Sequence, residues 1–177
     1  MQDRYGIDQY VRSIPDFPEE GIIFRDITSV IQDAEGLKKS IDGMIESLKD
    51  VDFDLVLGPE SRGFIFGMPV AYALGKGFVM ARKKGKLPRE TVGADYDLEY
   101  GKATVEIHKD AIKPGQKVVL IDDLIATGGT LQATKKLIEM GGGTVTDFFG
   151  VVGLPDLKYE EVLAPANVTT LINYAGA

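Results

Sequence analysis

The sequence predicts a single α/β domain, residues 1–177, with a doubly wound, mainly parallel twisted sheet flanked by helices. The first observation is that several short runs are apolar throughout, as in strands covered on both faces. The second is that stretches with helical periodicity separate these runs. The third is size, because 177 residues with 44% hydrophobic and 27% charged residues can build one domain with a real core.

The first expected helix covers residues 33–48. Its apolar side chains recur at helical spacing, and Asp33 is placed to cap its N-terminus. Two apolar runs follow, at residues 55–57 and 77–81, and the chain between them has helical character around residues 70–74. This order predicts a βαβ unit with two parallel strands.

A third apolar run, residues 118–121, precedes a helical pattern over residues 131–138 that stops at consecutive glycines, and residues 145–152 are expected to form a fourth strand. The carboxyl ends of parallel strands meet at one edge of the sheet, where ligands bind. Three segments suited to phosphate would meet there: residues 58–63, 82–86 and 122–130.

The longest stretch without a core pattern is residues 82–100, so we expect a loop that is functional or disordered. The only histidine, His108, follows the strand-like TVEIH and is expected to have a packing role.

Composition excludes several classes of protein. Without cysteine, disulfides and thiolate metal sites are impossible, and any metal should be a hard cation such as magnesium. A net charge of −7 argues against nucleic acid as a partner. The N-terminal residues lack a signal-peptide pattern, and no 18-residue apolar stretch occurs, so we expect a cytoplasmic protein with no membrane association.

The segment VVLIDDLIATGGT, residues 118–130, carries the clearest chemistry. Its Thr-Gly-Gly-Thr turn, residues 127–130, offers unobstructed backbone N–H groups and two hydroxyls at a helix N-terminus, which suits a phosphomonoester dianion. Asp122 and Asp123 can accept hydrogen bonds from vicinal sugar hydroxyls or hold magnesium through water. Together these groups predict a pocket for ribose 5-phosphate.

This segment resembles the phosphoribosyl pyrophosphate signature of the type I phosphoribosyltransferases. The resemblance implies that family's fold and Mg2+ as cofactor, held mainly by substrate oxygens and water near Asp122 and Asp123, with no certain protein ligand. It also implies substrate-binding roles for Asp122, Asp123, Leu124, Ala126, Thr127, Gly128, Gly129 and Thr130.

Residues 14–28, IPDFPEEGIIFRDIT, resemble the adenine-specific members of that family, in which a small N-terminal segment, here about residues 1–33, forms a hood over the base. The matching substrate-binding positions are Ile23, Phe24 and Arg25. An aromatic ring such as Phe24 can stack on a purine, and main-chain groups beside it can distinguish a 6-amino from a 6-oxo group. The implied reaction joins adenine to phosphoribosyl pyrophosphate, with inversion at the anomeric carbon, giving AMP and pyrophosphate for purine salvage.

Residues 58–67, GPESRGFIFG, resemble the family's pyrophosphate loop. The resemblance makes Arg62 a catalytic residue, because a guanidinium group can bind diphosphate oxygens through two parallel hydrogen bonds. Family members carry a cis peptide bond here, which would join Glu60 to Ser61. Glu60 differs from relatives that have aspartate at this position, and we expect this difference to be harmless.

Residues 81–101 resemble the mobile catalytic lid of the same enzymes, with residues 82–100 closing over the substrates. The resemblance makes Lys83 a catalytic residue and Lys86 a binding residue for pyrophosphate, although such a charge run is ordinarily a solvated surface. It places Tyr100 in the substrate site and makes Glu99 the acid-base group near adenine N7.

Two alternatives remain open. An enzyme for xanthine, hypoxanthine or guanine would share mainly residues 118–130, whereas the similarity over residues 14–100 favours adenine. A ligand-sensing regulator on the same fold would need a DNA-binding region, which the acidic composition disfavours. The family also implies a homodimer, although no residue pattern demonstrates an interface.

Overall fold

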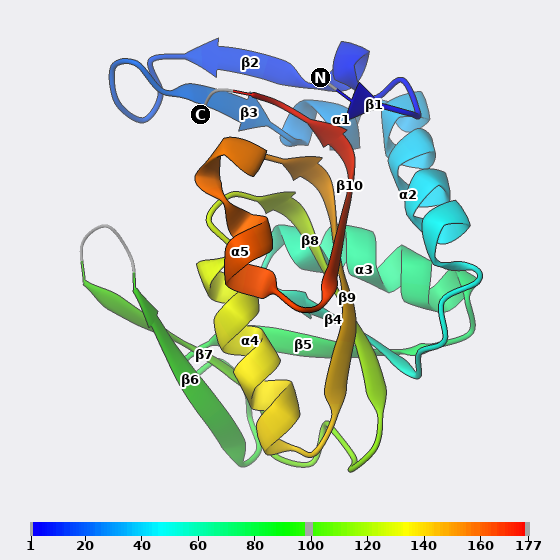
Figure 1. Cartoon of the computed structure of the whole chain (residues 1–177), viewed down its shortest axis with the longest axis vertical. Helices are drawn as coiled ribbons and strands as arrows, with labels where there is room; N and C mark the ends of the chain where they lie inside the picture. Colours follow the sequence, from blue (N-terminus) through cyan, green and yellow to red (C-terminus); the bar gives the residue numbers. More distant parts are fainter. Residues whose placement is uncertain (1, 98–100, 176–177) are drawn as a thin grey trace.

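The computed structural model describes residues 2–97 and 101–175, and within these ranges an eight-stranded sheet has the order β1-β10-β9-β8-β4-β5-β7-β6 (Figure 1). The strands from β10 to β5 are parallel, whereas β1, β7 and β6 pair in antiparallel fashion. The strands are β1 (Gln2–Asp3), β2 (Arg12–Pro15), β3 (Ile23–Asp26), β4 (Leu55–Pro59), β5 (Gly77–Lys83), β6 (Thr91–Asp97), β7 (Lys102–His108), β8 (Lys117–Ile125), β9 (Thr144–Gly153) and β10 (Asn167–Asn173).

Helices cover both faces of this sheet. They are α1 (Thr28–Gln32), α2 (Ala34–Leu48), α3 (Arg62–Ala73), α4 (Gly129–Met140) and α5 (Tyr159–Leu163), with short 3-10 turns at Asp8–Tyr10 and Pro155–Leu157. Consecutive residues of β8 point to opposite faces, so Val119 and Ile121 pack with α2 and α3, and Val118 and Leu120 pack with α4 and α5. None of the helices in the described ranges is long and apolar enough to cross a bilayer.

The parallel core agrees with the sequence prediction. The four expected strands lie within β4, β5, β8 and β9, and the expected helices lie within α2, α3 and α4. Asp33 caps α2 as expected, because one of its carboxylate oxygens accepts hydrogen bonds from the backbone N–H groups of Glu35 and Gly36, both at 2.9 Å.

The expectation of a loop without strands over residues 82–100 is wrong. Strand β6 lies in this segment and pairs with β7 to form a ribbon that extends from the sheet edge (Figure 1). Val92, Ala94 and Tyr96 alternate along β6 and pack against the core cluster that contains α4. The intervening Gly93 and Asp95 are poor strand formers and obscured this alternation in the sequence.

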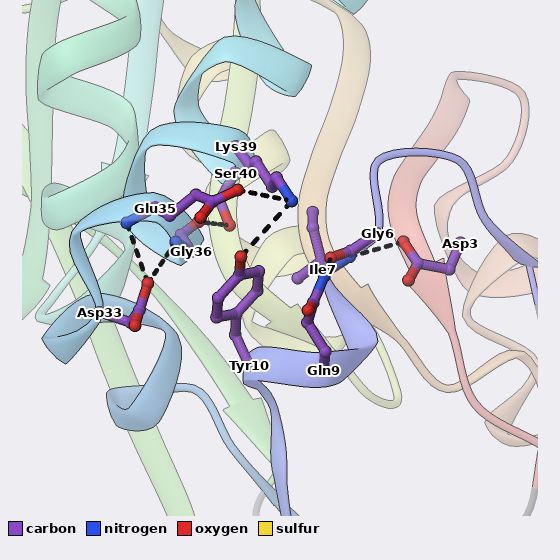
Figure 2. Close-up of polar contacts among 10 residues, drawn as sticks. All are labelled: Asp3, Gly6, Ile7, Gln9, Tyr10, Asp33, Glu35, Gly36, Lys39 and Ser40. Carbon is purple, nitrogen blue, oxygen red and sulfur yellow. Dashed lines mark hydrogen bonds and ion pairs between the residues drawn. The ribbon is translucent and has the colours of Figure 1, made fainter.

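The N-terminal residues form a separate hairpin, β2–β3, which lies at the top of Figure 1. Its base is attached to α2 through Tyr10 (Figure 2): the hydroxyl lies 3.4 Å from Lys39 Nζ, and the ring lies against Gly36. A Cβ atom at position 36 would lie 2.9 Å from Tyr10 Cγ, so only glycine permits this approach. The hairpin therefore has a fixed attachment to the core.

Candidate active site

A cavity of about 110 Å3 lies at the carboxyl end of β8 and the start of α4. The turn before α4 depends on Gly128, whose φ of +81° lies in the left-handed region that favours glycine. A Cβ atom there would also approach Leu163 Cγ to 3.2 Å. The cavity is lined by Asp122, Leu124, Ile125, Ala126, Thr127, Gly128, Gly129, Thr130 and Leu131.

This cavity has the chemistry of an anion site. The first backbone N–H groups of α4 have no intrahelical partner, and the helix dipole places partial positive charge at its N-terminus. Among the described residues that are not its chain neighbours, a Cβ atom built at Gly129 would meet Thr127 Oγ1 alone, at 3.7 Å. The turn can therefore present its main chain to a small phosphate group without steric obstruction.

Two carboxylates stand beside the cavity in different environments. Asp123 is buried and forms an ion pair with Arg62 at the start of α3. Asp122 Oδ1 accepts a hydrogen bond from the backbone N–H of Asp123 at 2.9 Å. Burial, followed by the negative charge of Asp123, raises the pKa of Asp122 well above its ordinary value. The hydrogen bond with Asp123 holds the pKa of Arg62 above its usual range.

A second cavity of about 110 Å3 lies between the hairpin and the core. Leu124 and its neighbour Asp123 belong to its lining, and Leu124 also lines the first cavity, so the two hollows adjoin. The lining residues are Phe24, Arg25, Asp26, Ile27, Thr28, Arg62, Asp123 and Leu124. The N-terminal hairpin therefore faces the end of β8, as a hood over a base would require.

The hairpin is fixed by the side chain of Arg25. The Arg25 guanidinium lies 4.1 Å from the ring centre of Tyr174 and donates a hydrogen bond to Ser13. The Tyr174 hydroxyl in turn donates to Asp8 Oδ1 at 2.8 Å. Contacts with Ser13 and Tyr174 hold the Arg25 guanidinium on the hairpin, and its buried Nε has no hydrogen-bond partner within residues 2–97 and 101–175. Phe24 packs edge-on against Phe17, with the ring centres 5.1 Å apart.

The basic segment after β5 lies beside the predicted pyrophosphate loop. Glu60 Oε2 accepts a hydrogen bond from Arg82 Nε at 2.7 Å, and Glu60 Oε1 accepts one from the backbone N–H of Lys83 at 3.1 Å. Burial opposes ionisation of Glu60, but these hydrogen bonds and charges outweigh it and lower its pKa. The peptide bond between Glu60 and Ser61 is cis, as the resemblance implied.

The structure brings most of the predicted site residues together. Phe24, Arg25 and Arg62 share one cavity, whereas Lys83, Lys86 and Ile23 line neither cavity. Glu99 and Tyr100 lie outside the described residues. His108 ends β7 and also lines neither cavity.

The prediction missed some lining residues, namely Asp26, Ile27, Thr28, Ile125 and Leu131. A signal was present for Asp26, because it precedes Thr28 by two residues, a spacing suited to local capping. Asp26 accepts hydrogen bonds from the Thr28 hydroxyl at 2.6 Å and the Thr28 backbone N–H at 2.9 Å. The hydroxyl first, and then the backbone N–H, lowers the pKa of Asp26.

Comparison with known proteins defines the class first. Residues 28–148 match the family described as the phosphoribosyl transferase domain, which covers more than half of the chain. The chain therefore belongs to the phosphoribosyltransferase family.

Individual relatives show which members of the phosphoribosyltransferase family this chain is similar to. The adenine phosphoribosyltransferase of Lachnoclostridium phytofermentans is 61% identical over 170 residues, covering 96% of this chain and 98% of that protein. The crystal structure of the enzyme of that name from Thermoanaerobacter pseudethanolicus is 48% identical with a TM-score of 0.91, covering 95% and 98%. The one from Saccharomyces cerevisiae, complexed with an imino-altritol bisphosphate and adenine, is 39% identical with a TM-score of 0.87, covering 94% and 96%.

Proposed function

We infer that this protein is a transferase that moves the 5-phosphoribosyl group of phosphoribosyl pyrophosphate to adenine, giving AMP and pyrophosphate. The observation that carries this conclusion is the shared wall at Leu124, which joins a phosphate cradle to the cavity under the hairpin. A sugar phosphate in one cavity and a planar base in the other would meet at that wall. The near-full-length relatives with this name support the same activity.

The β8 turn, residues 127–130, would hold the 5-phosphate, while Asp122 and Asp123 accept hydrogen bonds from the ribose hydroxyls. Arg62 would bind the diphosphate, because it lines the cavity under the hairpin and carries a guanidinium group. Its present partner is Asp123, so binding of the sugar diphosphate would replace part of that ion pair. Lys83 and Lys86 would stabilise the charge that develops on the departing pyrophosphate.

Phe24 would stack on adenine, and the main chain of Ile23 and Arg25 would recognise the base edge. The contacts of the Arg25 guanidinium with Tyr174 and Ser13 support this division, because they hold the side chain on the hairpin. Glu99 remains our candidate for the proton leaving adenine as the new bond forms, with Tyr100 beside it, and closure over residues 82–100 would exclude water. These last roles rest on the family resemblance.

We also propose magnesium as the cofactor. The described residues hold no cluster of three or more potential metal-ligating side chains, but they place the two aspartates of β8 beside the phosphate cradle. This donor set suits a hard cation bound largely through substrate oxygens and water. When bound, magnesium would neutralise charge on the diphosphate.

A homodimer is part of this proposal, supported by an apolar stripe on α3. Ile65, Met68 and Tyr72 recur at helical spacing and are 39%, 52% and 87% exposed. Exposure of such an apolar stripe to water is energetically unfavourable, and a second copy of the chain would cover it. Met68→Glu should shift the sedimentation coefficient to that of a monomer, whereas an unchanged value would contradict a dimer through α3. The cytoplasmic location stays a prediction.

The activity itself is tested by supplying phosphoribosyl pyrophosphate, magnesium and one base at a time: adenine, hypoxanthine, guanine or xanthine. We expect AMP from adenine and no nucleotide from the other three bases. Turnover of a 6-oxopurine would overturn the role of the hairpin in base selection. Retained diphosphate binding without turnover of any base would favour a regulator.

A further inference from the structure

Residues 83–86 form a tight turn between β5 and β6, which we call the lysine turn. The backbone N–H of Lys86 donates to the carbonyl oxygen of Lys83 at 3.2 Å, and Arg82 Nη1 donates to the carbonyl oxygen of Lys86 at 3.1 Å. Gly85 has a φ of +77°, which lets the chain reverse here. The turn therefore has one defined backbone conformation.

Two carboxylates from other elements hold this turn. The carboxylate of Glu60 binds Arg82 Nε and the backbone N–H of Lys83, as described above. Glu106 of β7 lies opposite Arg82 in the strand register, and its Oε2 accepts a hydrogen bond from the backbone N–H of Gly85 at 3.0 Å. The Glu60 side chain is 15% exposed and Glu106 is 9% exposed, so solvent competes weakly for these contacts.

The lysine ammonium groups form no hydrogen bond in this network, although the charge of Lys83 helps to lower the pKa of Glu60. Within residues 2–97 and 101–175, neither Lys83 nor Lys86 has a side-chain hydrogen bond or ion pair. The network instead uses the backbone of the turn and the guanidinium of Arg82, which also compensates the charge of Glu60. The ammonium groups of Lys83 and Lys86 are thus presented on a backbone that the carboxylates of Glu60 and Glu106 hold.

We propose that Glu60 and Glu106 are positioning residues for the lysine turn, keeping Lys83 and Lys86 in place for the departing pyrophosphate without touching it themselves. This inference rests on the proposed function, because it assumes that the two lysines meet pyrophosphate. Preorganised cations stabilise a leaving group better than mobile ones, since no ordering is needed as the reaction proceeds.

The test uses Glu60→Gln and Glu106→Gln in the full-length protein. Each change keeps the side-chain shape but removes the charge and part of the accepting capacity. We expect the KM for phosphoribosyl pyrophosphate to rise about tenfold in each variant, as for the loss of a charge-assisted hydrogen bond. The KM for adenine should stay within about twofold, because the base site is built from other elements.

Glu90→Gln is the matched control. It removes the same type of carboxylate from an exposed ion pair with Lys109, next to the Thr91–His108 pair that ends the β6–β7 ribbon. We expect both KM values of this variant to equal those of the unmodified protein. Equal rises in the KM for adenine and for the sugar diphosphate in Glu60→Gln would indicate general damage and overturn the positioning role.

A triple variant separates this inference from the function on which it rests. If Glu60 acts through the lysines, adding Glu60→Gln to Lys83→Ala and Lys86→Ala should cost no more than the lysine changes alone. Fully additive losses would refute the positioning role. If the lysine variants have an unchanged KM for the sugar diphosphate, the proposed role of the lysines is refuted as well. If this KM rises in the lysine variants but not in the glutamate variants, the positioning role alone is refuted.

Discussion

The β8 turn and the lysine turn both offer positive potential to a phosphate group, but they are constructed differently. The β8 turn, residues 127–130, uses main-chain N–H groups at the start of α4, and its shape is set by Gly128 within the same segment. The lysine turn uses side-chain cations and depends on carboxylates from β7 and from the loop after β4. The first is therefore a local structure and the second a tertiary one.

This difference predicts which substitutions should damage each phosphate site. A local phosphate site should be damaged mainly by changes within its own residues. A tertiary site should be damaged by changes far away in the sequence, such as at Glu60 or Glu106. Arg62 is a further distant residue that acts on the end of β8. It lies at the start of α3 and forms an ion pair with the Asp123 carboxylate.

Arg62→Ala should have the largest effect, because it removes a diphosphate ligand and leaves Asp123 buried without its cation. We expect kcat/KM to fall by about a thousandfold and the free energy of unfolding to fall by about 2 kcal/mol, a value discounted because Arg62 is half exposed. Arg89→Ala, which breaks the exposed pair with Asp110, should change the free energy of unfolding by less than about 0.5 kcal/mol. Similar denaturant midpoints for both variants would contradict the assigned burial of Asp123.

Gly128→Ala should rank second and tests the local site. The left-handed φ and the approach to Leu163 should lower the free energy of unfolding by about 1 to 2 kcal/mol and raise the KM for the sugar diphosphate about a hundredfold. The control is Gly75→Ala, where φ is +65° but no atom lies within 4 Å of the new Cβ. It should lose stability without any change in that KM. An unaffected KM in Gly128→Ala would remove the β8 turn from the site.

Asp122→Asn should impair the enzyme while stabilising it. Because the pKa of Asp122 is raised on folding, its contribution to stability declines as pH rises from the unfolded value of 3.8 through the folded value. Above that range the folded protein holds a charge that desolvation and the neighbouring Asp123 disfavour, and the amide would remove it. We expect a gain of about 1 kcal/mol at neutral pH together with a lower kcat/KM. A variant that is less stable at neutral pH would contradict this explanation.

The smallest effect concerns acid stability through Glu60. The pKa of Glu60 is lower in the folded protein than the ordinary value of 4.5, so the carboxylate stabilises the fold above that value. This stabilisation is lost as pH falls through the folded pKa, and we expect it to amount to less than about 1 kcal/mol. Urea unfolding between about pH 6 and pH 3 should show a shallower decline for Glu60→Gln. Parallel curves for the two proteins would rule out the Glu60 contribution.

The sequence predicted the local parts of the site best. Residues 118–130 contain a buried strand, two carboxylates and a glycine turn within one continuous segment. The structure places Asp122 and the turn in one cavity and Asp123 in the adjoining cavity. The parallel strands could be predicted equally well from the sequence, because an apolar run is recognised without knowing its distant partner. The capping of α2 by Asp33 is another contact within a few residues.

Contacts between distant segments could not be predicted. Strand β6 was missed because Gly93 and Asp95 obscure its alternation, so that pairing with β7 and packing against α4 decide its conformation. Likewise, nothing in the sequence near Glu60 indicates that it binds Arg82, or that the Arg25 side chain is held by Tyr174. Long-range side-chain pairs of this kind depend on the completed fold.

The most direct test of the account is calorimetric binding of ribose 5-phosphate and of pyrophosphate, each titrated separately with magnesium into Thr127→Val and Lys83→Ala. Thr127→Val should weaken binding of ribose 5-phosphate and retain pyrophosphate, because it changes only the β8 turn. Lys83→Ala should show the reverse. If either substitution weakened both ligands equally, or weakened only the other ligand, the assignment of the two turns to opposite ends of one substrate would be contradicted.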